Sequence, residues 1–503
     1  MNDKQIIIIG AGIAGLSAGC YGLMNGYKVH IFEQNTSPGG LCTSWDRKGF
    51  IINGGLAFLG GSGPGTDFYQ IWKELGVVPG IQMIDFDYFI IVEGEGNKTF
   101  YLHTNLAKLE KHMQDLAPED ENLIQEFISG IKLFTNYQVP VEKAQELYTP
   151  WDKMKFVFTR FPLIRAIAKW KKVTIKQFAD RFKNPFLRDA LLQAKAIFSD
   201  DLPLLAFQMF LAWGHLRSAG FPEGGGLRLS KAIEKRFLEL GGRIYYESCV
   251  SKILVKKGYA CGIRLENGSE HSSDHVISAS DLRKTVFDML EGQYINAEIQ
   301  GYFDHLPVAS SVVMVALGLS REFSELPSTA VGIVYPLNSP MTIAGKEVKY
   351  LRPMIYNFDG TLAPEGKTLL RVVLPADYDY WKALGENQTQ YEKEKDDVLE
   401  KVINLLEQRF PGISSQVEMS DVATPLTLEH HTGNWRGSTV GWDATTQTFL
   451  KSITKILPGL QNFWMAGQWV EPGGGVPMAA LSGRNIIQLI VKKDKKPFLT
   501  TVP

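Results

Sequence analysis

A glycine-rich turn near the start of the chain constrains its fold more than any other feature. Four consecutive isoleucines, Ile6 to Ile9, are typical of a parallel strand that is buried on both faces. Gly10, Gly12 and Gly15 follow in a G-x-G-x-x-G pattern, before a helix-like segment. The first glycine permits a tight turn, the second lets backbone approach a pyrophosphate, and the third lets helix and strand pack closely. This order predicts a nucleotide-binding unit.

An acidic residue supports the same interpretation. Val29 to Phe32 has the pattern of a second strand, and Glu33 ends it. A carboxylate roughly 20 residues after the glycines can accept hydrogen bonds from both ribose hydroxyls and would repel a 2′-phosphate. The amides and dipole at the start of the intervening helix favour an anion. The segment therefore predicts an adenine dinucleotide.

Length and charge limit what else the chain can be. Its 503 residues suffice for two or three domains with a large core. With 45% hydrophobic and 21% charged residues it has a globular composition. The net charge of −1 gives no overall field that would recruit nucleic acid, so we expect no nucleic-acid partner.

The cysteines and the uncharged N-terminal segment bear on the compartment. Four cysteines show neither a C-x-x-C pair nor metal-ligand spacing, which indicates free thiols, a reducing compartment and no metal site. Residues 5–27 carry no charge, but their glycines divide them into strand, turn and helix, unlike a membrane span or signal peptide. We expect a cytoplasmic protein, with membrane association left open.

Further glycine turns connect the chain to a known family. Pro38-Gly39-Gly40-Leu41 and Asn53-Gly54-Gly55 flank short apolar strands and suit backbone that passes close to a ligand. Together with the first turn and Glu33, they resemble the N-terminus of FAD-dependent amine oxidases and carotenoid desaturases. Leu41 stands where that superfamily usually has an arginine, and Asn53 where it usually has an aspartate.

Later segments resemble phytoene desaturases, carotenoid isomerases and retinol saturases of the same superfamily. The resemblance implies an α/β fold, in which a discontinuous Rossmann-type FAD-binding domain is joined to a substrate domain with a mixed or antiparallel sheet and helices. The expected FAD-binding segments are 1–100, 220–300 and 451–503. A helical segment that contacts substrate or membrane is expected at 101–219, and the substrate sheet with helices at 301–450.

The resemblance also implies where the cofactor binds. In such proteins the valine corresponding to Val250 meets the adenine, and a C-terminal helix after a glycine turn, here Gly467–Gly475, directs its dipole at the isoalloxazine. Gln468 replaces the acid usual in that turn, and no nearby cysteine offers a covalent attachment point. We therefore expect noncovalent FAD. The expected binding residues are Gly10, Ala11, Gly12, Ile13, Ala14, Gly15, Glu33, Gln34, Gly40, Leu41, Gly54, Gly55, Leu56, Val250, Gly467, Gly475, Val476 and Pro477.

Three residues are candidates for catalysis. Glu471 lies in the turn beside the expected flavin edge and can serve as an acid or base, or can simply cap the turn. His431, with its neighbour His430, and Arg436 can donate or relay a proton, but a structural role is as open to each. Cys20 is expected in the core.

The family likeness implies a flavoenzyme that desaturates, saturates or isomerises carbon–carbon bonds of a long apolar, isoprenoid or polyene-like substrate. Two alternatives share the fold. One is a flavin amine oxidase. The other is a non-catalytic prenyl-binding escort protein, against which the intact glycine motifs and Glu33 argue, because a carrier need not keep a flavin site.

Residues 153–188 suggest a further partner. They contain eleven lysines and arginines against one acid, Asp180, interleaved with aromatic and aliphatic residues. A basic amphipathic helix of this kind can lie in a membrane interface and bind anionic headgroups. The alternative is a solvated helix face over ordinary core.

Overall fold

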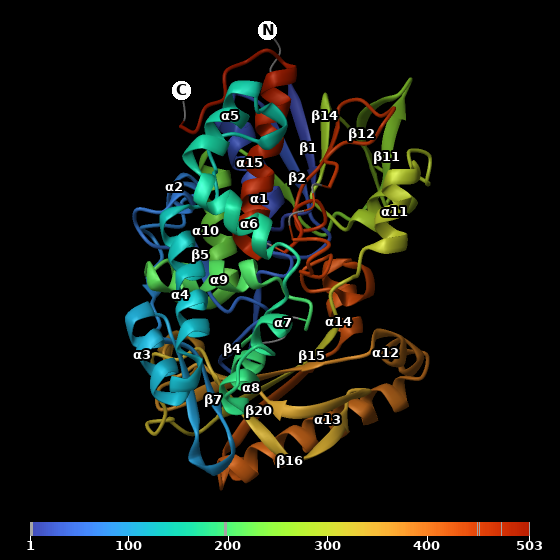
Figure 1. Cartoon of the computed structure of the whole chain (residues 1–503). Coiled ribbons are helices and arrows are strands. Elements are labelled where there is room, and N and C mark those ends of the chain that lie inside the picture. Colours follow the sequence, from blue (N-terminus) through green and yellow to red (C-terminus); the bar gives the residue numbers. More distant parts are fainter. Residues whose placement is uncertain (1–3, 196–198, 450, 452, 474, 502–503) are drawn as a thin grey trace.

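The computed structural model describes residues 4–195, 199–449, 451, 453–473 and 475–501. A parallel five-stranded sheet, in the order β10-β2-β1-β14-β21, forms one end of the molecule, close to both chain termini (Figure 1). Its strands come from widely separated segments: β1 (Gln5–Ile9), β2 (Lys28–Phe32), β10 (Arg243–Tyr245), β14 (His275–Ser278) and β21 (Phe463–Met465). The expected discontinuous nucleotide-binding fold is therefore confirmed.

The isoleucine strand lies in the middle of this sheet. Ile6, Ile7 and Ile8 are fully buried and Ile9 is nearly so. Such burial on both faces requires helices or sheets on each side of the strand. The elements packed around it are α1 (Ile13–Met24), α10 (Gly225–Glu239), α15 (Gly475–Lys493) and the antiparallel strands β11 (Val250–Lys256), β12 (Tyr259–Leu265) and β13 (Glu270–Ser272).

Two four-stranded sheets lie at the opposite end of the molecule (Figure 1). One, β18-β19-β15-β20, is antiparallel, and the other, β17-β16-β7-β8, contains the parallel pair β7 and β16. Their strands are β7 (Tyr88–Glu93), β8 (Thr99–His103), β15 (Val312–Leu319), β16 (Ile333–Ile343), β17 (Lys346–Leu351), β18 (Pro353–Ile355), β19 (Thr368–Pro375) and β20 (Val417–Ala423). The helices beside them are α12 (Tyr378–Gly385), α13 (Gln388–Arg409) and α14 (Pro425–Thr432).

Short strands and a helical region join the two ends. The short strands are β3 (Ser44–Arg47), β4 (Phe50–Asn53), β5 (Leu59–Gly60), β6 (Met83–Ile84) and β9 (Ala219–Pro222). The helices are α2 (Asp67–Glu74), α3 (Leu106–Leu116), α4 (Glu121–Asn136), α5 (Pro150–Thr159), α6 (Phe161–Trp170), α7 (Ile175–Ala179), α8 (Pro185–Ala194), α9 (Leu204–His215) and α11 (Ala297–His305). Helix α9 is apolar and largely buried, as expected for core.

Helix α10 begins at Gly225 because Gly224 and Gly225 adopt the left-handed turn that starts it. Strands β17 and β18 are separated before Pro353, which cannot donate a ladder hydrogen bond. One expectation from the sequence was wrong. The basic segment 153–188 is not one helix: α5 and α6 meet at a bend before Pro162, and α7 and the start of α8 follow.

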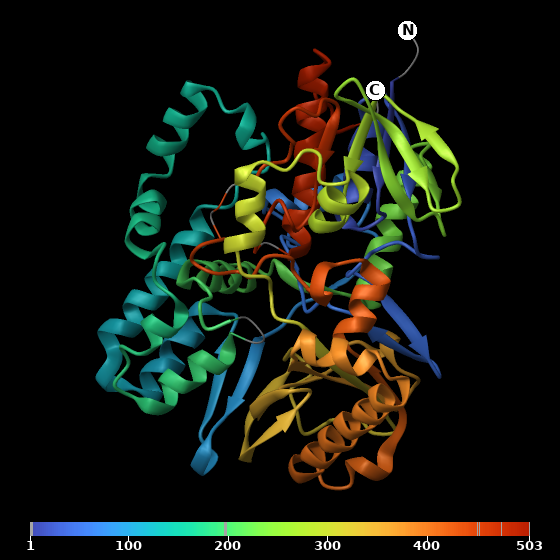
Figure 2. The ribbon, with the colours of Figure 1, turned by 90° about the vertical axis from the view of Figure 1, so that its right-hand side faces the viewer.

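Helices α5 and α6 form an arm, residues 150–170, that stands away from the rest of the protein (Figure 2, upper left). No residue of α5 is buried, and α6 buries only Leu163. Trp151, Phe158 and Phe161 expose 67%, 76% and 60% of their surface. The arm is the part of the described chain where large apolar side chains are left most open to solvent.

Candidate functional site

The first glycine turn joins β1 to α1 in the geometry that its motif predicts. The amide of Gly10 donates to the carbonyl of Phe32 (2.8 Å), and a Cβ on Gly15 would lie 2.0 Å from the Gly10 carbonyl oxygen. Glycine is therefore required at position 15. Gly12 precedes α1 without a side-chain cap, and a Cβ there would meet nothing within 4 Å. The residue before the first turn of α1 thus borders open space, as expected at an anion-binding helix end.

Glu33 is held rigidly beside this turn. It is 5% exposed, and one carboxylate oxygen accepts from the amide of Ala11 (2.7 Å) while the other accepts from Asn35 (2.9 and 2.8 Å). The Glu33 carbonyl accepts from the amide of Ser248 (2.8 Å), which brings the start of β11, with buried Val250, to the same place. The acid and the valine, far apart in sequence, lie together here.

The second glycine turn lies directly against the first. The amide of Gly39 donates to the carbonyl of Ala11 (2.9 Å), and Gly39 pairs with Gly12 as a short parallel bridge. Gly40 and Leu41 follow in the same turn, and a Cβ on Gly40 would lie 3.7 Å from the Cα of Gly12. Two turns that were predicted separately therefore line one site.

Asn53 organises the third turn. It is fully buried; its side-chain amide donates to the carbonyl of Leu56 (2.5 Å), and its oxygen accepts from the amide of Gly226 (3.1 Å). An asparagine can both donate and accept here, whereas an ionised aspartate could only accept. The departure from the family pattern thus has a structural role. Gly54 and Gly55 stay partly open, and Gly55 is exposed.

The C-terminal motif closes against α1. The amide of Gly467 donates to the hydroxyl of Ser482 (2.8 Å), and Ser17 donates to the carbonyl of Ala480 (2.7 Å). A Cβ on Gly483 would lie 2.4 Å from the carbonyl oxygen of Ala14, so the two helices cross at backbone contact. Helix α15 begins at Gly475, with Val476 and Pro477 in its first turn; Gly474 lies outside the described residues.

These pieces fit an adenine dinucleotide. The uncapped start of α1 meets an open space, and the two glycine turns and a buried carboxylate border the same place. The start of α15 supplies a second helix N-terminus beside α1. The geometry defines a class, the dinucleotide-binding proteins in which the cofactor domain is assembled from separate stretches of chain.

Glu471 is one end of a three-residue ion-pair chain. Lys455, which is 9% exposed, lies 2.7 Å from a Glu471 oxygen and 2.6 Å from a Glu146 oxygen. Burial alone would lower the pKa of Lys455, but the two carboxylates outweigh it and raise that pKa above its ordinary value. A protonated lysine therefore fixes the Glu471 carboxylate in the turn before α15.

The structure places the other two catalytic candidates at the surface near the opposite sheet. Arg436 forms a two-point ion pair with Asp379 (3.1 and 2.7 Å), and these hydrogen bonds raise the pKa of its guanidinium. His431 is exposed at the end of α14, and its carbonyl accepts from Gln34 (3.2 Å) and Asn35 (2.8 Å). Its backbone thus contacts the loop after β2, and its ring lies against that of His430.

A buried acid that was not among the predicted site residues follows β14. Asp281 is 2% exposed and accepts from the amides of Lys284 (2.8 Å) and Trp435 (2.9 Å). Burial raises the pKa of its carboxyl to about 6, despite those two hydrogen bonds. Asp281 therefore links the nucleotide-binding sheet to the 434–442 loop, with a carboxyl pKa held above its ordinary value.

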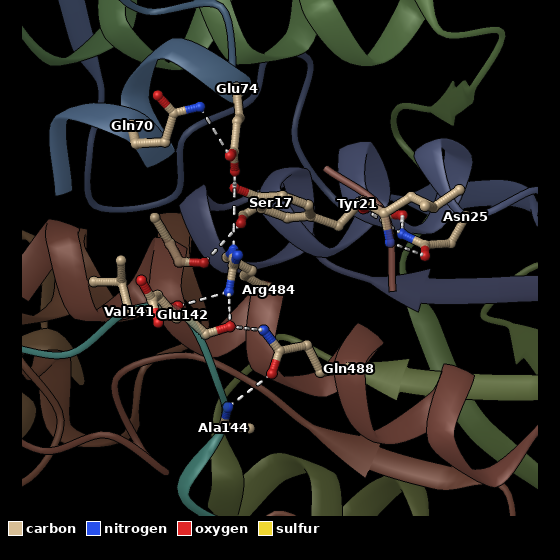
Figure 3. A network of polar contacts seen from close by, with 12 residues as sticks. Ser17, Tyr21, Asn25, Gln70, Glu74, Val141, Glu142, Ala144, Arg484 and Gln488 are labelled. Carbon is tan, nitrogen blue, oxygen red and sulfur yellow. Dashed lines mark hydrogen bonds and ion pairs between the residues drawn. The ribbon is translucent and has the colours of Figure 1, made fainter. Parts of the chain in front are cut away.

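Helix α15 also anchors the base of the arm (Figure 3). Arg484 donates to the carbonyls of Val141 (2.6 Å) and Glu142 (3.1 Å) and lies 3.8 Å from Glu74 of α2. Gln488 donates to Glu142 (2.9 Å) and accepts from the amide of Ala144 (2.7 Å). Helix α15 thus contacts α1 through Ala480 and Gly483 and, further along, the chain that leads into the arm.

Comparisons with known proteins identify the class more closely. The chain belongs to the flavin-containing amine oxidoreductases, whose family model matches residues 13–490. It is therefore a flavin-dependent oxidoreductase.

Two relatives match over nearly the whole chain. The chain is 23% identical to the chloroplastic prolycopene isomerase of Daucus carota, over 96% of this chain and 79% of the relative. It is 22% identical to the lycopene-forming phytoene desaturase of Pseudescherichia vulneris, over 97% and 99%. Among solved structures, an oxidoreductase from Methanosarcina mazei superposes with a TM-score of 0.62 at 19% identity, covering 96% of this chain and all of that one.

Sequence reasoning missed Lys455 and Asn434. Asn434 accepts hydrogen bonds from Gln468 (3.2 Å) and from the indole of Trp469 (3.1 Å), so it holds the turn Gly467–Gly475 in place. Neither residue lies in a motif, and an isolated lysine or asparagine carries no signal in a single sequence. By contrast, Cys20 was correctly predicted as core and is fully buried.

Proposed function

We propose that the chain binds FAD noncovalently and acts on carbon–carbon bonds of a long apolar, polyene-like substrate. The observation that carries the proposal is the full-length likeness to a prolycopene isomerase and a phytoene desaturase, together with intact glycine turns and Glu33. A bound flavin would supply the hydride acceptor or donor at its N5 atom.

The chain's own residues would then bind and orient the cofactor, and one of them would exchange a proton with the substrate. Glu33 and the first amides of α1 would hold the ribose and pyrophosphate, and the start of α15 would face negative charge on the ring. Glu471, fixed by Lys455, would accept or return a proton at the substrate through its Oε atoms. The protonated Nζ of Lys455 lies 2.7 Å from one of these oxygens.

The decisive experiment is anaerobic mixing of the purified protein with a panel of polyenes, retinoids, steroids and amines while flavin absorbance is recorded. Bleaching of oxidised flavin, or reoxidation of reduced flavin, by polyenes alone is expected. Peroxide release with amines, and none with polyenes, would instead establish an amine oxidase. A colourless protein that lacks flavin absorbance would favour the escort function.

The noncovalent attachment has its own test. Heat denaturation followed by centrifugation should leave yellow flavin in the supernatant, identified as FAD by chromatography. Flavin retained in the precipitate would contradict the proposal.

We also propose that the arm contacts an anionic membrane surface, through which an apolar substrate would enter. Trp151, Phe158 and Phe161 are exposed beside the exposed Lys153 and Lys155, a combination that suits the headgroup boundary. Lys169 contributes less, because Glu126 pairs with it (2.7 Å). No helix in the described part of the chain is long and apolar enough to cross a membrane.

Flotation with vesicles that contain phosphatidylserine tests the arm. The variant W151S/F158S/F161S should stay at the bottom of the gradient, while the wild type floats. The matched control is L238S, which removes an exposed leucine (49% exposed) on α10, away from the arm. Equal flotation of all three proteins would refute membrane binding by the arm.

A further inference from the structure

Arg371 is a buried cation without a buried anion. It lies on β19 and is 3% exposed. One terminal nitrogen donates to the carbonyl of Asn53, the other contacts the sulfur of Met354 (3.1 Å), and Nε has no hydrogen-bond partner. Among the described residues no carboxylate lies within ion-pair distance of its guanidinium.

Another buried arginine of the same molecule, Arg484, has both hydrogen-bond acceptors and a nearby carboxylate. Arg484, 7% exposed, donates to two carbonyls and has Glu74 at 3.8 Å. Removing a charged group from water costs several kcal/mol unless an opposite charge and hydrogen bonds offset it. A neutral carbonyl and a weakly accepting thioether do little to offset that cost at Arg371.

The position of Arg371 is where a bound molecule is expected. Its acceptor, the Asn53 carbonyl, immediately precedes Gly54 and Gly55 in the third turn, while β19 belongs to the antiparallel sheet at the other end. Tyr356, whose ring centroid lies 5.8 Å from the guanidinium carbon, has its hydroxyl 3.4 Å from the Asn53 amide. The cation therefore lies at the junction between the cofactor-binding half and the sheet half.

We propose that Arg371 binds an anionic oxygen group of a small molecule at this junction. A guanidinium has five donors in a fixed plane and pairs well with carboxylate or phosphate oxygens. Two sources share this chemistry: a terminal carboxylate on an apolar substrate, or an anionic oxygen of the flavin. The assignment rests on the proposed function only in taking the ligand to be a long apolar molecule or flavin.

Equilibrium binding distinguishes the two sources without requiring turnover. Holoprotein of the wild type and of R371M, which keeps an unbranched apolar stem but removes the guanidinium, is titrated with retinoic acid and with retinol. Release of FAD on dilution is followed by flavin fluorescence. The control K367M removes a half-buried cation immediately before the same strand, where Glu418 pairs with it.

If the partner is a substrate carboxylate, R371M should bind retinoic acid about tenfold or more weakly while binding retinol unchanged. If the partner is the flavin, R371M should lose FAD about tenfold more readily, with both titrations altered equally. R371M that matches the wild type and K367M within about twofold in all three measurements would overturn the proposal.

A second variant covers the case in which R371M does not fold. R371K keeps the charge but loses the planar fork, so it should fold and bind the same anion several-fold more weakly. R371K indistinguishable from the wild type, together with equal affinities of the wild type for retinoic acid and retinol, would also overturn the proposal. A failed proposed function would show instead as absent turnover with these binding differences intact.

Discussion

The α1–α15 crossing and the arm formed by α5 and α6 illustrate two opposite ways in which this chain uses helices. At the crossing, glycines bring backbone against backbone, and a single Cβ on Gly483 would collide with Ala14. In the arm, no residue of α5 is buried, and aromatic side chains face solvent. Steric demands determine the first region, whereas little inside the protein constrains the second. Substitutions should therefore have large effects in the first and small effects in the second.

The largest effect is expected from G15A. Its Cβ would lie 2.0 Å from the Gly10 carbonyl oxygen, so β1 and α1 must separate, at a cost of about 3 kcal/mol or more in unfolding free energy. Denaturant unfolding of the purified protein would measure this loss.

The neighbouring G12A is the matched control. Gly12 has a φ of −69°, and its Cβ would meet nothing within 4 Å, so the fold should be kept within about 0.5 kcal/mol. The new methyl would still fill the space expected for the pyrophosphate, and FAD affinity should fall about tenfold or more. If G12A and G15A unfolded alike, the glycines would have no distinct roles.

A pH-dependent effect is expected at Asp281. Its folded pKa of about 6 exceeds the ordinary value of 3.8, so between pH 4 and 6 the folded state holds more protons than the unfolded state. The contribution of Asp281 to the free energy of unfolding should then fall as pH rises through this window and stay constant above it. In D281N this residue no longer titrates, so its pH-dependent contribution to the free energy of unfolding disappears. The variant also loses one hydrogen-bond acceptor, which lowers its stability at every pH.

The measurement is the difference in unfolding free energy between D281N and the wild type at several pH values. It should shift in favour of D281N by about 3 kcal/mol from below pH 4 to above pH 6.5, because the pKa difference is roughly 2 units. A difference that stays constant with pH would show that Asp281 is not the titrating group.

The two regions also differ in how much the sequence revealed. Gly10, Gly12, Gly15 and Glu33 follow a spacing that only one local geometry satisfies, so the βαβ unit was predicted closely. Residues 153–188 were predicted as a basic amphipathic helix, because charge and apolar patterning do not show where the breaks between α5, α6, α7 and α8 fall.

Long-range polar contacts were beyond the sequence altogether. Lys455 forms ion pairs with Glu146 and Glu471, although Glu146 and Lys455 are 309 residues apart in the sequence. Likewise, Arg371 sits in an ordinary apolar strand pattern, and only the fold shows that no described acid pairs with it. Periodicity and motifs report local geometry, whereas ion pairs of this kind depend on the tertiary arrangement.

An intermediate effect on unfolding free energy is expected at the ion pairs of Lys455, between the α1–α15 crossing and the arm. K455M leaves the carboxylates of Glu146 and Glu471 facing each other without their cation, and should cost about 2 kcal/mol of unfolding free energy. E146Q removes one carboxylate but leaves the Lys455–Glu471 pair, so it should cost clearly less. Denaturant unfolding of both variants provides the comparison, and E146Q costing as much as K455M would contradict a central role for the lysine.

The smallest effect on stability is expected in the arm. W151S/F158S/F161S removes three large side chains, but all are more than half exposed, so little packing is lost. Unfolding free energy should change by less than about 0.5 kcal/mol, and FAD release should match the wild type. A loss of several kcal/mol would show that these rings pack inside the protein in solution. With stability unchanged, the exposed rings would be kept for contacts outside the fold, as the proposed membrane contact requires.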